Sequence, residues 1–439
     1  MPIAEGQKTV VMGLGYIGLP TAALIARSGI ETIGVDVNEH VVETVNKGQV
    51  HLEEVDLDGL VRGVVERGAL RASLEVEPAD NFLIAVPTPL GEANDPDISY
   101  VLDAAARIAP FLEPGNLIIL ESTSPVGTTE KMCATIAEAR GDLKVPGHCD
   151  GPADIFVAYC PERVLPGRIL AELVANDRCI GGITPRCARR AMTFYRNFVR
   201  GECVTTTARA AELVKLVENS FRDVNIAFAN ELSMIADGMD IDVWDVVRLA
   251  NRHPRVNVLQ PGPGVGGHCI AVDPWFIVHG DPGNSRLIRT AREVNLAKTD
   301  HVVARAKAMI KALPNDMKIA LFGLAFKPNI DDFRESPALD VAVALAAEFG
   351  DRIAIVEPFA DALPKPLAGT QAQLVALDDA LDQCGAIVLL VDHDVFKSVP
   401  LGERRDKIVY DTRGLWPDQP VRSNWTERRA PSQGKPDKR

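Results

Sequence analysis

Short apolar runs and longer amphipathic runs alternate along most of the chain. Apolar runs of this length, bounded by glycine, proline or polar residues, are typical of buried parallel strands, and the amphipathic runs are typical of the helices that connect them. In the first half, strands are expected at residues 9–12, 30–35, 82–86, 117–121 and 155–159. The alternation starts again near residue 318, and strands are expected there at 319–323, 353–356, 386–391 and 407–410, with a helix at 337–349.

The pattern between these two halves is helical. Residues 208–237 form one long run with few breakers, and further helices are expected near 243–251 and 285–313. The chain is therefore expected to be an α/β protein, with two Rossmann-like domains joined by a helical dimerisation domain that contains a long central helix. The expected domains are 1–205, 206–312 and 313–423, followed by a polar, proline-rich and disordered tail at 424–439.

The composition of the chain mainly excludes other classes of protein. A chain of 439 residues is too long for one ordinary core, which agrees with two or three domains. The net charge of −13 argues against general nucleic-acid binding, and no apolar run approaches the length of a membrane span. The eight cysteines show neither CxxC pairs nor Cys/His ligand spacing, which predicts no metal site and suits a reducing compartment. We therefore expect a cytoplasmic protein.

A glycine-rich turn, GLGYIG at residues 13–18, follows the first expected strand and opens a helix. Gly13 would make the turn, Gly15 would admit a pyrophosphate, and Gly18 would let the helix pack closely on the strand. Asp36 ends the second strand, where a carboxylate binds the ribose hydroxyls of NAD and repels the 2′-phosphate of NADP. This arrangement predicts an NAD site; the alternative is a glycine turn that binds nothing.

Loops at the ends of two later strands carry further candidates for cofactor binding. Pro87 and Thr88 leave the third strand abruptly, at the sheet edge where the cofactor of such a fold lies. Thr123 belongs to a hydroxyl-rich loop at residues 122–129. Its hydroxyls suit contacts to water or ribose, and the alternative is an ordinary N-cap cluster for the next helix.

Two polar positions indicate acid–base and oxyanion chemistry. Glu162 follows a strand end and is a candidate general base; the alternative is a structural ion pair with Arg163 or Arg168. Lys215 and Asn219 lie four residues apart on the long helix and therefore share a face. An ammonium beside a carboxamide is suited to stabilising an oxyanion, and the alternative is a lysine on the solvated face.

A proline- and glycine-rich stretch at residues 261–275 contains one cysteine. Cys269 follows the glycines after one residue, His268, and Asp273 comes four residues later. Glycine lets a backbone approach a ligand closely, because it has no Cβ to clash. From this stretch alone two interpretations remain open, a reactive thiol or a tight inter-domain turn with a buried cysteine.

The second α/β half differs from the first at its opening turn. Residues 323–328 lack the GxGxxG pattern, so a second NAD is not expected there in the same manner. Lys327, Asp332 and Arg334 cluster after the first strand of this half.

Six segments in this order resemble the UDP-glucose/GDP-mannose dehydrogenase family. They cover most of the chain and lie at residues 13–20, 121–129, 159–162, 212–219, 264–273 and 322–337. The resemblance implies an N-terminal NAD domain, a helical dimerisation domain and a C-terminal UDP-binding domain. It also implies oxidation of the C6 alcohol of a UDP-sugar to a carboxylate, with two NAD reduced per turnover, in a homodimer that supplies surface polysaccharide synthesis.

The resemblance assigns roles to the candidate residues. Cys269 would be the covalent nucleophile, Glu162 the general base, and Lys215 and Asn219 the oxyanion clamp. Thr123 and Asp273 would position the water that hydrolyses the thioester. The NAD contacts implied are Gly13, Gly15, Tyr16, Ile17, Gly18, Asp36, Pro87, Thr88 and Thr123. The substrate contacts implied are Glu162, Arg163, Lys215, Asn219, Arg255, Gly266, Lys327 and Arg334, of which Arg255 would serve the neighbouring subunit's site.

Three positions depart from the pattern of the UDP-glucose enzymes. Pro166 stands where those enzymes tend to carry a second glutamate, and His268 and Val272 replace a serine and a lysine. The sequence around Cys269 resembles instead the branch of the family that acts on 2-acetamido sugars. The expected substrate is UDP-N-acetyl-D-mannosamine, with UDP-N-acetylglucosamine and then UDP-glucose as alternatives.

Two other function classes are weighed against this interpretation. A two-electron β-hydroxyacid dehydrogenase would share an NAD domain and a helical Lys/Asn pair, but it needs neither Cys269 nor a C-terminal α/β domain. A non-catalytic nucleotide-sugar sensor would be expected to have lost the cysteine, the lysine or the glycines, and all of these are present.

Overall fold

The computed structural model describes residues 6–52, 54–165 and 167–417, and its contacts divide the chain into two compact units. The first unit comprises residues 1–218 and 275–284, and the second comprises residues 219–274 and 285–439. Helix α8 (Ala208–Gly238) begins in the first unit and ends in the second, and α10 (Asp273–Gly280) begins in the second and ends in the first. Pro166 and the tail at 424–439 lie outside the described residues.

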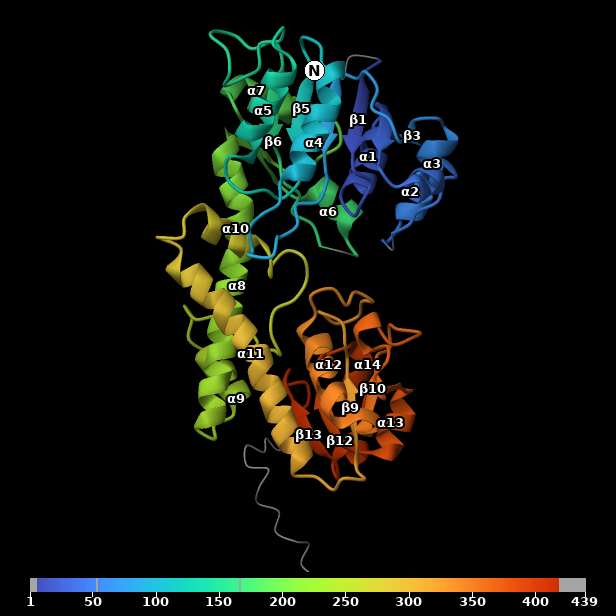
Figure 1. The fold of residues 1–439 in the computed structure, drawn as a ribbon, viewed down its shortest axis with the longest axis vertical. Coiled ribbons are helices and arrows are strands. Elements are labelled where there is room, and N and C mark those ends of the chain that lie inside the picture. Colours follow the sequence, from blue (N-terminus) through green and yellow to red (C-terminus); the bar gives the residue numbers. More distant parts are fainter. Residues whose placement is uncertain (1–5, 53, 166, 418–439) are drawn as a thin grey trace, which may run out of the picture. The chain divides into compact units, whose positions relative to one another are not determined.

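The first unit contains an eight-stranded sheet in the order β3-β2-β1-β4-β5-β6-β7-β8 (Figure 1). Its strands are parallel except where β6 meets β7. The strands are β1 (Lys8–Met12), β2 (Glu31–Val35), β3 (Leu70–Ser73), β4 (Asn81–Ile84), β5 (Leu117–Leu120), β6 (Phe156–Tyr159), β7 (Arg178–Gly182) and β8 (Cys203–Thr207). The helices are α1 (Gly18–Arg27), α2 (Glu39–Asn46), α3 (Leu57–Glu66), α4 (Ser99–Ile108), α5 (Thr128–Ala139), α6 (Ile169–Ala175), α7 (Pro185–Tyr195) and the short η1 (Ala109–Phe111).

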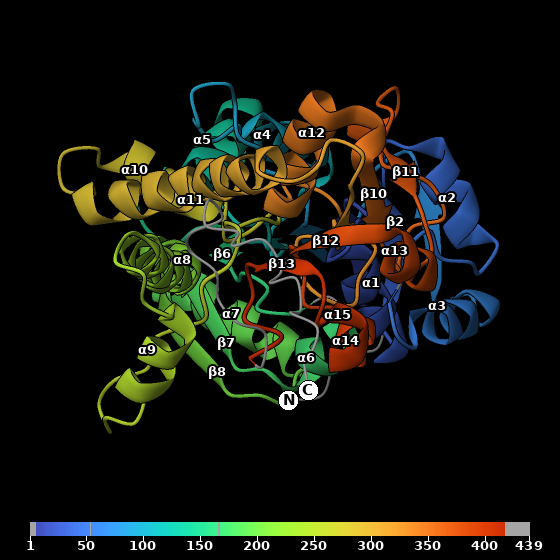
Figure 2. The same cartoon turned by 90° about the horizontal axis from the view of Figure 1, so that it is seen from below.

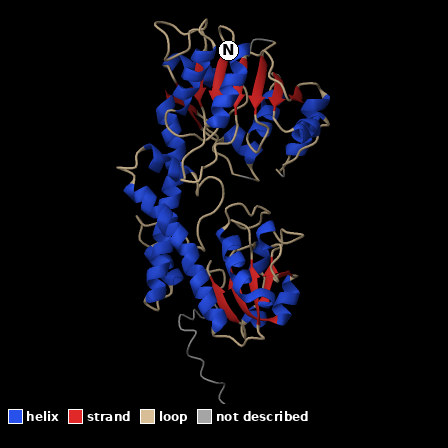
Figure 3. Cartoon of the chain, in the orientation of Figure 1, coloured by secondary structure: helices blue, strands red, loops and turns tan. Residues whose placement is uncertain are grey.

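Helices cover both faces of this sheet, as expected for strands that are apolar on both sides (Figure 3). Apolar side chains of α1, α3 and α7 pack on one face, and those of α4 and α5 pack on the other. The order β3-β2-β1-β4-β5-β6 places the reversal of strand order between β1 and β4, which is where ligands bind in doubly wound sheets.

The second unit contains a five-stranded parallel sheet in the order β11-β10-β9-β12-β13. The strands are β9 (Lys318–Phe322), β10 (Ile353–Val356), β11 (Gln373–Leu374), β12 (Cys384–Leu389) and β13 (Ile408–Asp411). The remaining elements are α9 (Val243–Ala250), α11 (Arg286–Lys311), α12 (Pro337–Phe349), η2 (Gly350–Arg352), η3 (Lys365–Leu367), α13 (Leu377–Gln383), α14 (Asp394–Lys397) and α15 (Leu401–Arg404). Helices α11 and α12 pack on one face of this sheet, and α13 and the α14 region on the other (Figure 2).

The predicted fold class is confirmed: two Rossmann-like α/β sheets and a helical segment with one long helix. The helix at 337–349 and the strand at 353–356 have the bounds predicted. The structure also contains elements that the hydrophobic pattern does not predict, chiefly β7, β8 and α10.

A ladder of polar contacts, buried at every rung except Asp237–Arg305, joins the second-unit part of α8 to α11. Its most buried rung is the ion pair between Asp223 and Arg292, at 2.6 Å. The other rungs are Asn230–Asn295 at 2.9 Å, Ser233–Lys298 at 2.8 Å and Asp237–Arg305 at 2.9 Å. Because an unpaired buried charge is costly, these matched groups fix the register of the two helices.

Lys298 is the rung with a testable pH dependence. Burial lowers the pKa of Lys298 from 10.5 to about 8, and Ser233 Oγ is the acceptor of its hydrogen bond. Between pH 8 and pH 10.5 the unfolded chain binds more protons than the folded chain, so the free energy of unfolding rises with pH in this range. Below about pH 8 the full cost of burying the charged Lys298 ammonium is present. Lys298→Met is therefore expected to raise the free energy of unfolding by about 1–3 kcal/mol at pH 7.

Urea unfolding at pH 7 and pH 10 measures this effect. The gain from Lys298→Met should shrink at pH 10, because the wild-type ammonium has by then lost most of its proton. Lys311→Met, at an exposed position on the same helix, should give no pH-dependent gain. An equal gain from Lys298→Met at both pH values would contradict the assignment.

Candidate active site

The glycine turn after β1 has the geometry of a dinucleotide cradle. Gly13 has φ +88°, and its N–H donates to Val35 O at 2.7 Å. A Cβ at Gly13 would lie 2.7 Å from Ala85 O, and one at Gly18 would lie 1.8 Å from Gly13 O. A Cβ at Gly15 would meet no atom within 4 Å. The turn is therefore tightly packed except at Gly15, where a pyrophosphate has room to approach, and the residues fit NAD.

The other cofactor candidates lie around this turn, after β2, β4 and β5. The Asp36 carboxylate accepts the N–H groups of Leu14 (2.8 Å) and Asn38 (2.9 Å), which fix it beside the turn. Thr88 donates its hydroxyl to Thr123 O at 2.5 Å and thereby joins two of the loops. The remaining candidates in these loops are Tyr16, Ile17 and Pro87.

Glu162 and Lys215 form a buried ion pair in the first unit. Lys215 Nζ lies 3.1 Å from Glu162 Oε1, and the two side chains are only 7% and 11% exposed. The second carboxylate oxygen of Glu162 accepts the N–H of Val164 at 2.9 Å. The alternative of a solvated lysine is therefore wrong, because the ammonium is held inside the protein against a carboxylate.

Arg163 and Arg168 are engaged elsewhere. Arg163 Nη2 lies 2.6 Å from Glu218 Oε1, and Arg168 Nε lies 3.7 Å from Glu172 Oε1. The alternative ion pair of Glu162 with either arginine is therefore wrong. Substrate binding by Arg163 stays a prediction, in which its guanidinium would have to act beside Glu218.

The hydroxyl-rich loop before α5 is capped by a side chain from α8. Glu212 accepts the N–H of Gly127 at 2.6 Å and both the N–H (2.8 Å) and the hydroxyl (2.6 Å) of Thr129. The residue at the N-cap itself, Gly127, offers no side chain. An ordinary N-cap cluster is thus not what this loop forms. Instead, Glu212 ties it to the first turns of the helix that carries Lys215.

The glycine–cysteine loop belongs to the second unit and is fixed on two sides. Near its start, the N–H of Gly262 donates to Asn230 Oδ1 on α8 at 2.9 Å. In its middle the backbone packs closely, because a Cβ at Gly266 would lie 2.2 Å from Glu335 O, in the segment between β9 and α12. Any side chain at Gly266 would therefore push the loop away from the C-terminal sheet.

Cys269 is the one exposed cysteine among the described residues. Its carbonyl accepts the N–H groups of Val272 (3.1 Å) and Asp273 (2.9 Å), which turns the chain into α10. The Asp273 carboxylate is buried and accepts the side-chain N–H of Asn219 at 2.5 Å. The alternative of a buried structural cysteine is therefore wrong. The same short turn therefore carries both the Cys269 thiol and the fixed Asp273 carboxylate.

The predicted nucleotide-gripping residues lie after β9. Arg334 donates to Asp332 through Nε (2.8 Å) and Nη2 (2.6 Å), so part of its guanidinium is already engaged. Burial, and after it the charge of Arg334, lower the pKa of His268, which is therefore neutral at pH 7. Lys327 is half-buried, and its ammonium lies 5.8 Å from the centroid of the Phe326 ring.

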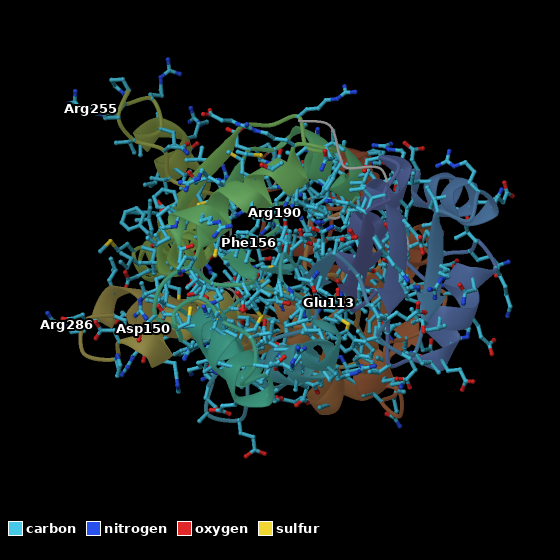
Figure 4. All side chains as sticks on the ribbon, turned by 90° about the horizontal axis from the view of Figure 1, so that it is seen from above. Glu113, Asp150, Phe156, Arg190, Arg255 and Arg286 are labelled. Atoms are coloured by element: carbon cyan, nitrogen blue, oxygen red, sulfur yellow. The ribbon has the colours of Figure 1, made fainter. Side chains whose placement is uncertain are left out.

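Arg255 stands apart from the other candidates of its unit. It follows α9, is exposed, and projects outward from the ribbon (Figure 4). Its exposed position agrees with the expectation that it serves a neighbouring subunit, which stays a prediction.

A buried carboxylate closes the opening turn of the second sheet, and the sequence interpretation missed it. Glu357, directly after β10, accepts the N–H groups of Leu324 (2.6 Å) and Ala325 (3.2 Å). His393 accepts the N–H of Asn329 through Nδ1 (2.9 Å), so its proton is on Nε2 and points to Glu357 at 3.3 Å. Glu357 and His393 thus bind three N–H groups of this turn.

The predicted catalytic residues form two groups. Glu162, Lys215 and Thr123 belong to the first unit, together with the glycine turn. Asn219, Cys269 and Asp273 belong to the second unit, together with Gly266, Arg255, Lys327 and Arg334. Helix α8 carries one member of each group, Lys215 and Asn219, one turn apart.

Neither a metal centre nor a membrane segment is found in the described part of the chain. No group of three or more His, Cys, Asp and Glu side chains there is placed to hold a metal ion. None of the helices within residues 6–417 combines the length and the apolar character needed to span a bilayer.

Comparison with known proteins gives matches over nearly the whole chain. The chain is 54% identical over 406 residues to the NDP-N-acetyl-D-galactosaminuronic acid dehydrogenase of Ralstonia solanacearum, covering 92% of this chain and 95% of that one. It is 54% identical over 413 residues to the UDP-N-acetyl-D-mannosamine dehydrogenase of Escherichia coli K12, covering 92% and 98%. The solved UDP-D-ManNAc dehydrogenase of Pyrococcus horikoshii aligns with a TM-score of 0.83 at 36% identity, covering 94% and 97%.

The three parts of one family match in order along the chain. Residues 7–199 match the family's NAD binding domain, residues 209–297 its central domain, and residues 320–418 its UDP binding domain. The predicted NAD cofactor and the predicted enzyme class, an NAD-dependent UDP-sugar dehydrogenase, are thereby confirmed. The chain belongs to the UDP-glucose/GDP-mannose dehydrogenase family.

Proposed function

We propose that this enzyme oxidises C6 of UDP-N-acetyl-D-mannosamine to the carboxylate through a thioester on Cys269, for use in surface polysaccharide synthesis in the cytoplasm. One observation carries the proposal. An exposed thiol follows a glycine loop packed against the turn after β9, and the same short turn holds Asp273 bound to Asn219. A nucleophile beside a fixed carboxylate and carboxamide suits a covalent oxidation followed by hydrolysis.

The reaction balances as one alcohol, two NAD⁺ and one water giving one carboxylate, two NADH and three protons. NAD, when bound, accepts the hydride of each oxidation. Glu162 takes the proton of the C6 hydroxyl, directly or through water, in the first oxidation. The Cys269 thiolate then bonds to the C6 aldehyde, and the resulting thiohemiacetal is oxidised to the thioester, which water cleaves to release the thiol.

The remaining residues act on charge and position. Lys215 and Asn219 stabilise the oxygen anion at C6 in both oxidations. Asp273 and Thr123 orient the water that cleaves the thioester. Lys327 and Arg334 hold the negative charge of the nucleotide.

The sugar is assigned from the relatives and from His268 and Val272. The matched relatives at 54% identity are named for UDP-N-acetyl-D-mannosamine and for an NDP-N-acetyl-D-galactosaminuronic acid, so the 2-acetamido group is their shared feature. NADH formation across the UDP derivatives of N-acetylmannosamine, N-acetylglucosamine, N-acetylgalactosamine and glucose tests the assignment. The highest kcat/KM is expected for UDP-N-acetyl-D-mannosamine, at two NADH per acid. Equal or better use of another sugar would overturn the choice of sugar, and one NADH with free aldehyde as final product would overturn the mechanism.

The proposed homodimer rests on an apolar stripe along the second-unit part of α8. Phe221, Phe228 and Ile235 are exposed and follow each other at seven-residue steps, so they share one face. Met239 and Leu249 are further exposed apolar side chains of the same unit. A stripe of this kind is typical of an association surface, and a second copy of the chain would cover it.

Phe228→Glu is expected to convert the dimer into monomer at micromolar concentration, because it places a charge in the centre of the stripe. Sedimentation velocity measures the change. Val55→Glu is the control, since Val55 is also exposed and apolar but lies in the first unit. A dimer that survives Phe228→Glu would exclude this stripe as the interface.

Arg255 allows the composition of each site to be tested by mixing. Arg255→Ala and Cys269→Ala enzymes should each be inactive as pure dimers. Co-refolded mixtures should regain activity, up to about half per mixed dimer, because one site then combines an intact Cys269 with the partner's Arg255. Mixtures without activity would show that Arg255 serves the site of its own subunit.

A further inference from the structure

A buried charged cluster lies behind the Glu162–Lys215 pair. Its four members come from different elements of the first unit: Glu121 after β5, Cys160 after β6, Arg178 on β7 and Tyr195 on α7. All four are at most 2% exposed. None of them was among the candidates predicted from the sequence, and none is used in the reaction proposed above.

The antiparallel step from β6 to β7 brings Arg178 toward Glu162. The paired residues end with Tyr159 opposite Gly181, and from there the chain continues to Glu162 in the direction of Arg178, at the start of β7. The two segments do run side by side beyond the paired residues, because the Asn176 side chain donates to Arg163 O at 2.6 Å. The electrostatic neighbours of Arg178 accordingly include Glu162 as well as Glu121.

The hydrogen bonds of Arg178 do not account for its burial. Nη2 donates to Leu173 O at 3.2 Å, but Nε and Nη1 donate to no described residue. Its guanidinium carbon lies 5.3 Å from the centroid of the Tyr195 ring. A buried cation with two unpaired nitrogens is unfavourable unless it offsets nearby negative charge. Its position therefore depends on the carboxylates around it.

The Cys160 thiol and the Tyr195 hydroxyl do not supply that negative charge at neutral pH. Burial raises the pKa of Cys160 to about 12 and raises the pKa of Tyr195 well above its usual value, so both groups are neutral. Burial also raises the pKa of Glu121, whose Oε1 accepts the Tyr195 hydroxyl at 2.6 Å. Cys203 on β8, whose pKa burial raises, is a further and neutral neighbour of the cation.

We propose that Arg178 is a positioning residue for Glu162: its buried positive charge offsets the negative charge of the Glu162 carboxylate while Lys215 turns its own charge toward the substrate. This inference rests on the proposed role of Glu162 as the base. The proposed mechanism gives Lys215 two tasks, pairing with Glu162 and stabilising the C6 oxygen anion. A second cation behind Glu162 removes the conflict, because the carboxylate stays compensated when the ammonium serves the substrate.

The pH profile of kcat/KM distinguishes this role from a structural one. In Arg178→Met, the acidic limb is expected to move up by about one to two pH units, because an opposite charge near a carboxylate is lost. At pH values below the limb, activity should therefore fall about 10- to 100-fold relative to wild type, and it should recover toward the wild-type value above the limb, with KM for the UDP-sugar unchanged. Arg178→Lys keeps the charge and should restore most of the profile. Loss by one factor at every pH, or no rescue by lysine, would overturn the proposal.

Two further variants keep the test decisive. Arg190→Met removes a half-buried arginine of α7 (Figure 4), which donates to Asn81 at 3.1 Å. This variant should leave the acidic limb of the pH profile where it is in wild type. If Arg178→Met does not fold, Arg178→Gln, which keeps hydrogen-bonding groups at this position without the charge, must show the upward shift.

Glu162→Gln separates failure of this inference from failure of the proposed function. If that variant keeps the wild-type acidic limb, Glu162 is not the base. Infrared spectroscopy then tests the inference about Arg178 by itself. The band of the protonated Glu162 carboxyl group, which is assigned by its absence in Glu162→Gln, should titrate at higher pH in Arg178→Met than in wild type. An unchanged midpoint would exclude the inference.

Discussion

Replacing Cys269 with alanine is expected to reduce formation of the uronate by about 10⁴-fold or more, because the thioester can no longer form. The first oxidation needs no thiol in the proposed mechanism, so at most one NADH should appear for each sugar consumed. Absorbance of NADH and chromatographic detection of the acid, followed in the same reaction, measure both quantities. The ratio of NADH to acid is the informative quantity, since it separates the two oxidations.

A second cysteine provides the control for this experiment. Cys149 is half-exposed and lies in the first unit, in the loop before β6, so Cys149→Ala should retain wild-type stoichiometry. Acid formed by Cys269→Ala at more than a few percent of the wild-type rate would contradict a covalent intermediate on this residue. It would leave the exposed thiol of the glycine loop without a chemical role.

The N-terminal half of the site is predictable from sequence because its requirements are local. A glycine at position 13 is needed by a positive φ, and one at 18 by contact with the turn itself, so the pattern of residues and the geometry coincide. Asp36 is found by counting from that turn, since it must end the next strand. The glycine–cysteine loop differs in this respect, because the backbone that Gly266 meets belongs to Glu335, far along the chain.

The features that the sequence does not reveal depend on partners far along the chain. Glu357 ends β10 as Asp36 ends β2, and each binds the N–H of the residue after the first glycine of its sheet, Leu324 and Leu14. Aligning the two α/β halves on their first strands is the signal that would have revealed Glu357. That alignment would not reveal its partner His393, however, which comes 36 residues later.

Strands β7 and β8 were missed for a different reason. The segment Arg178–Gly182 ends in two glycines and Cys203–Thr207 is polar, so neither has the apolar run of a buried strand. They extend the sheet by pairing with β6 and with each other. Because β7 is antiparallel to β6, it also brings Arg178 toward Glu162. The strand that is hardest to predict therefore carries the cation that we propose acts on Glu162.

Lys215→Met is expected to lower kcat by about 10²–10⁴-fold and to destabilise the protein by about 3 kcal/mol. Activity falls because the C6 oxygen anion loses its cation. Stability falls because Glu162 then lies buried without the ammonium now 3.1 Å away. Steady-state kinetics and urea unfolding measure the two effects, and Lys131→Met, at an exposed lysine of α5, should change neither.

The double variant Lys215→Met/Glu162→Gln separates the two roles of the pair. Removing both charges leaves a neutral carboxamide in place of the buried carboxylate, so most of the lost stability should return. Activity should remain at least as low as in Lys215→Met, because the oxyanion clamp and the base are both absent. If stability and activity returned together, the pair would be structural and the oxyanion role of Lys215 would be excluded. If neither stability nor activity recovered, burial of the unpaired carboxylate would not be the cause of the destabilisation.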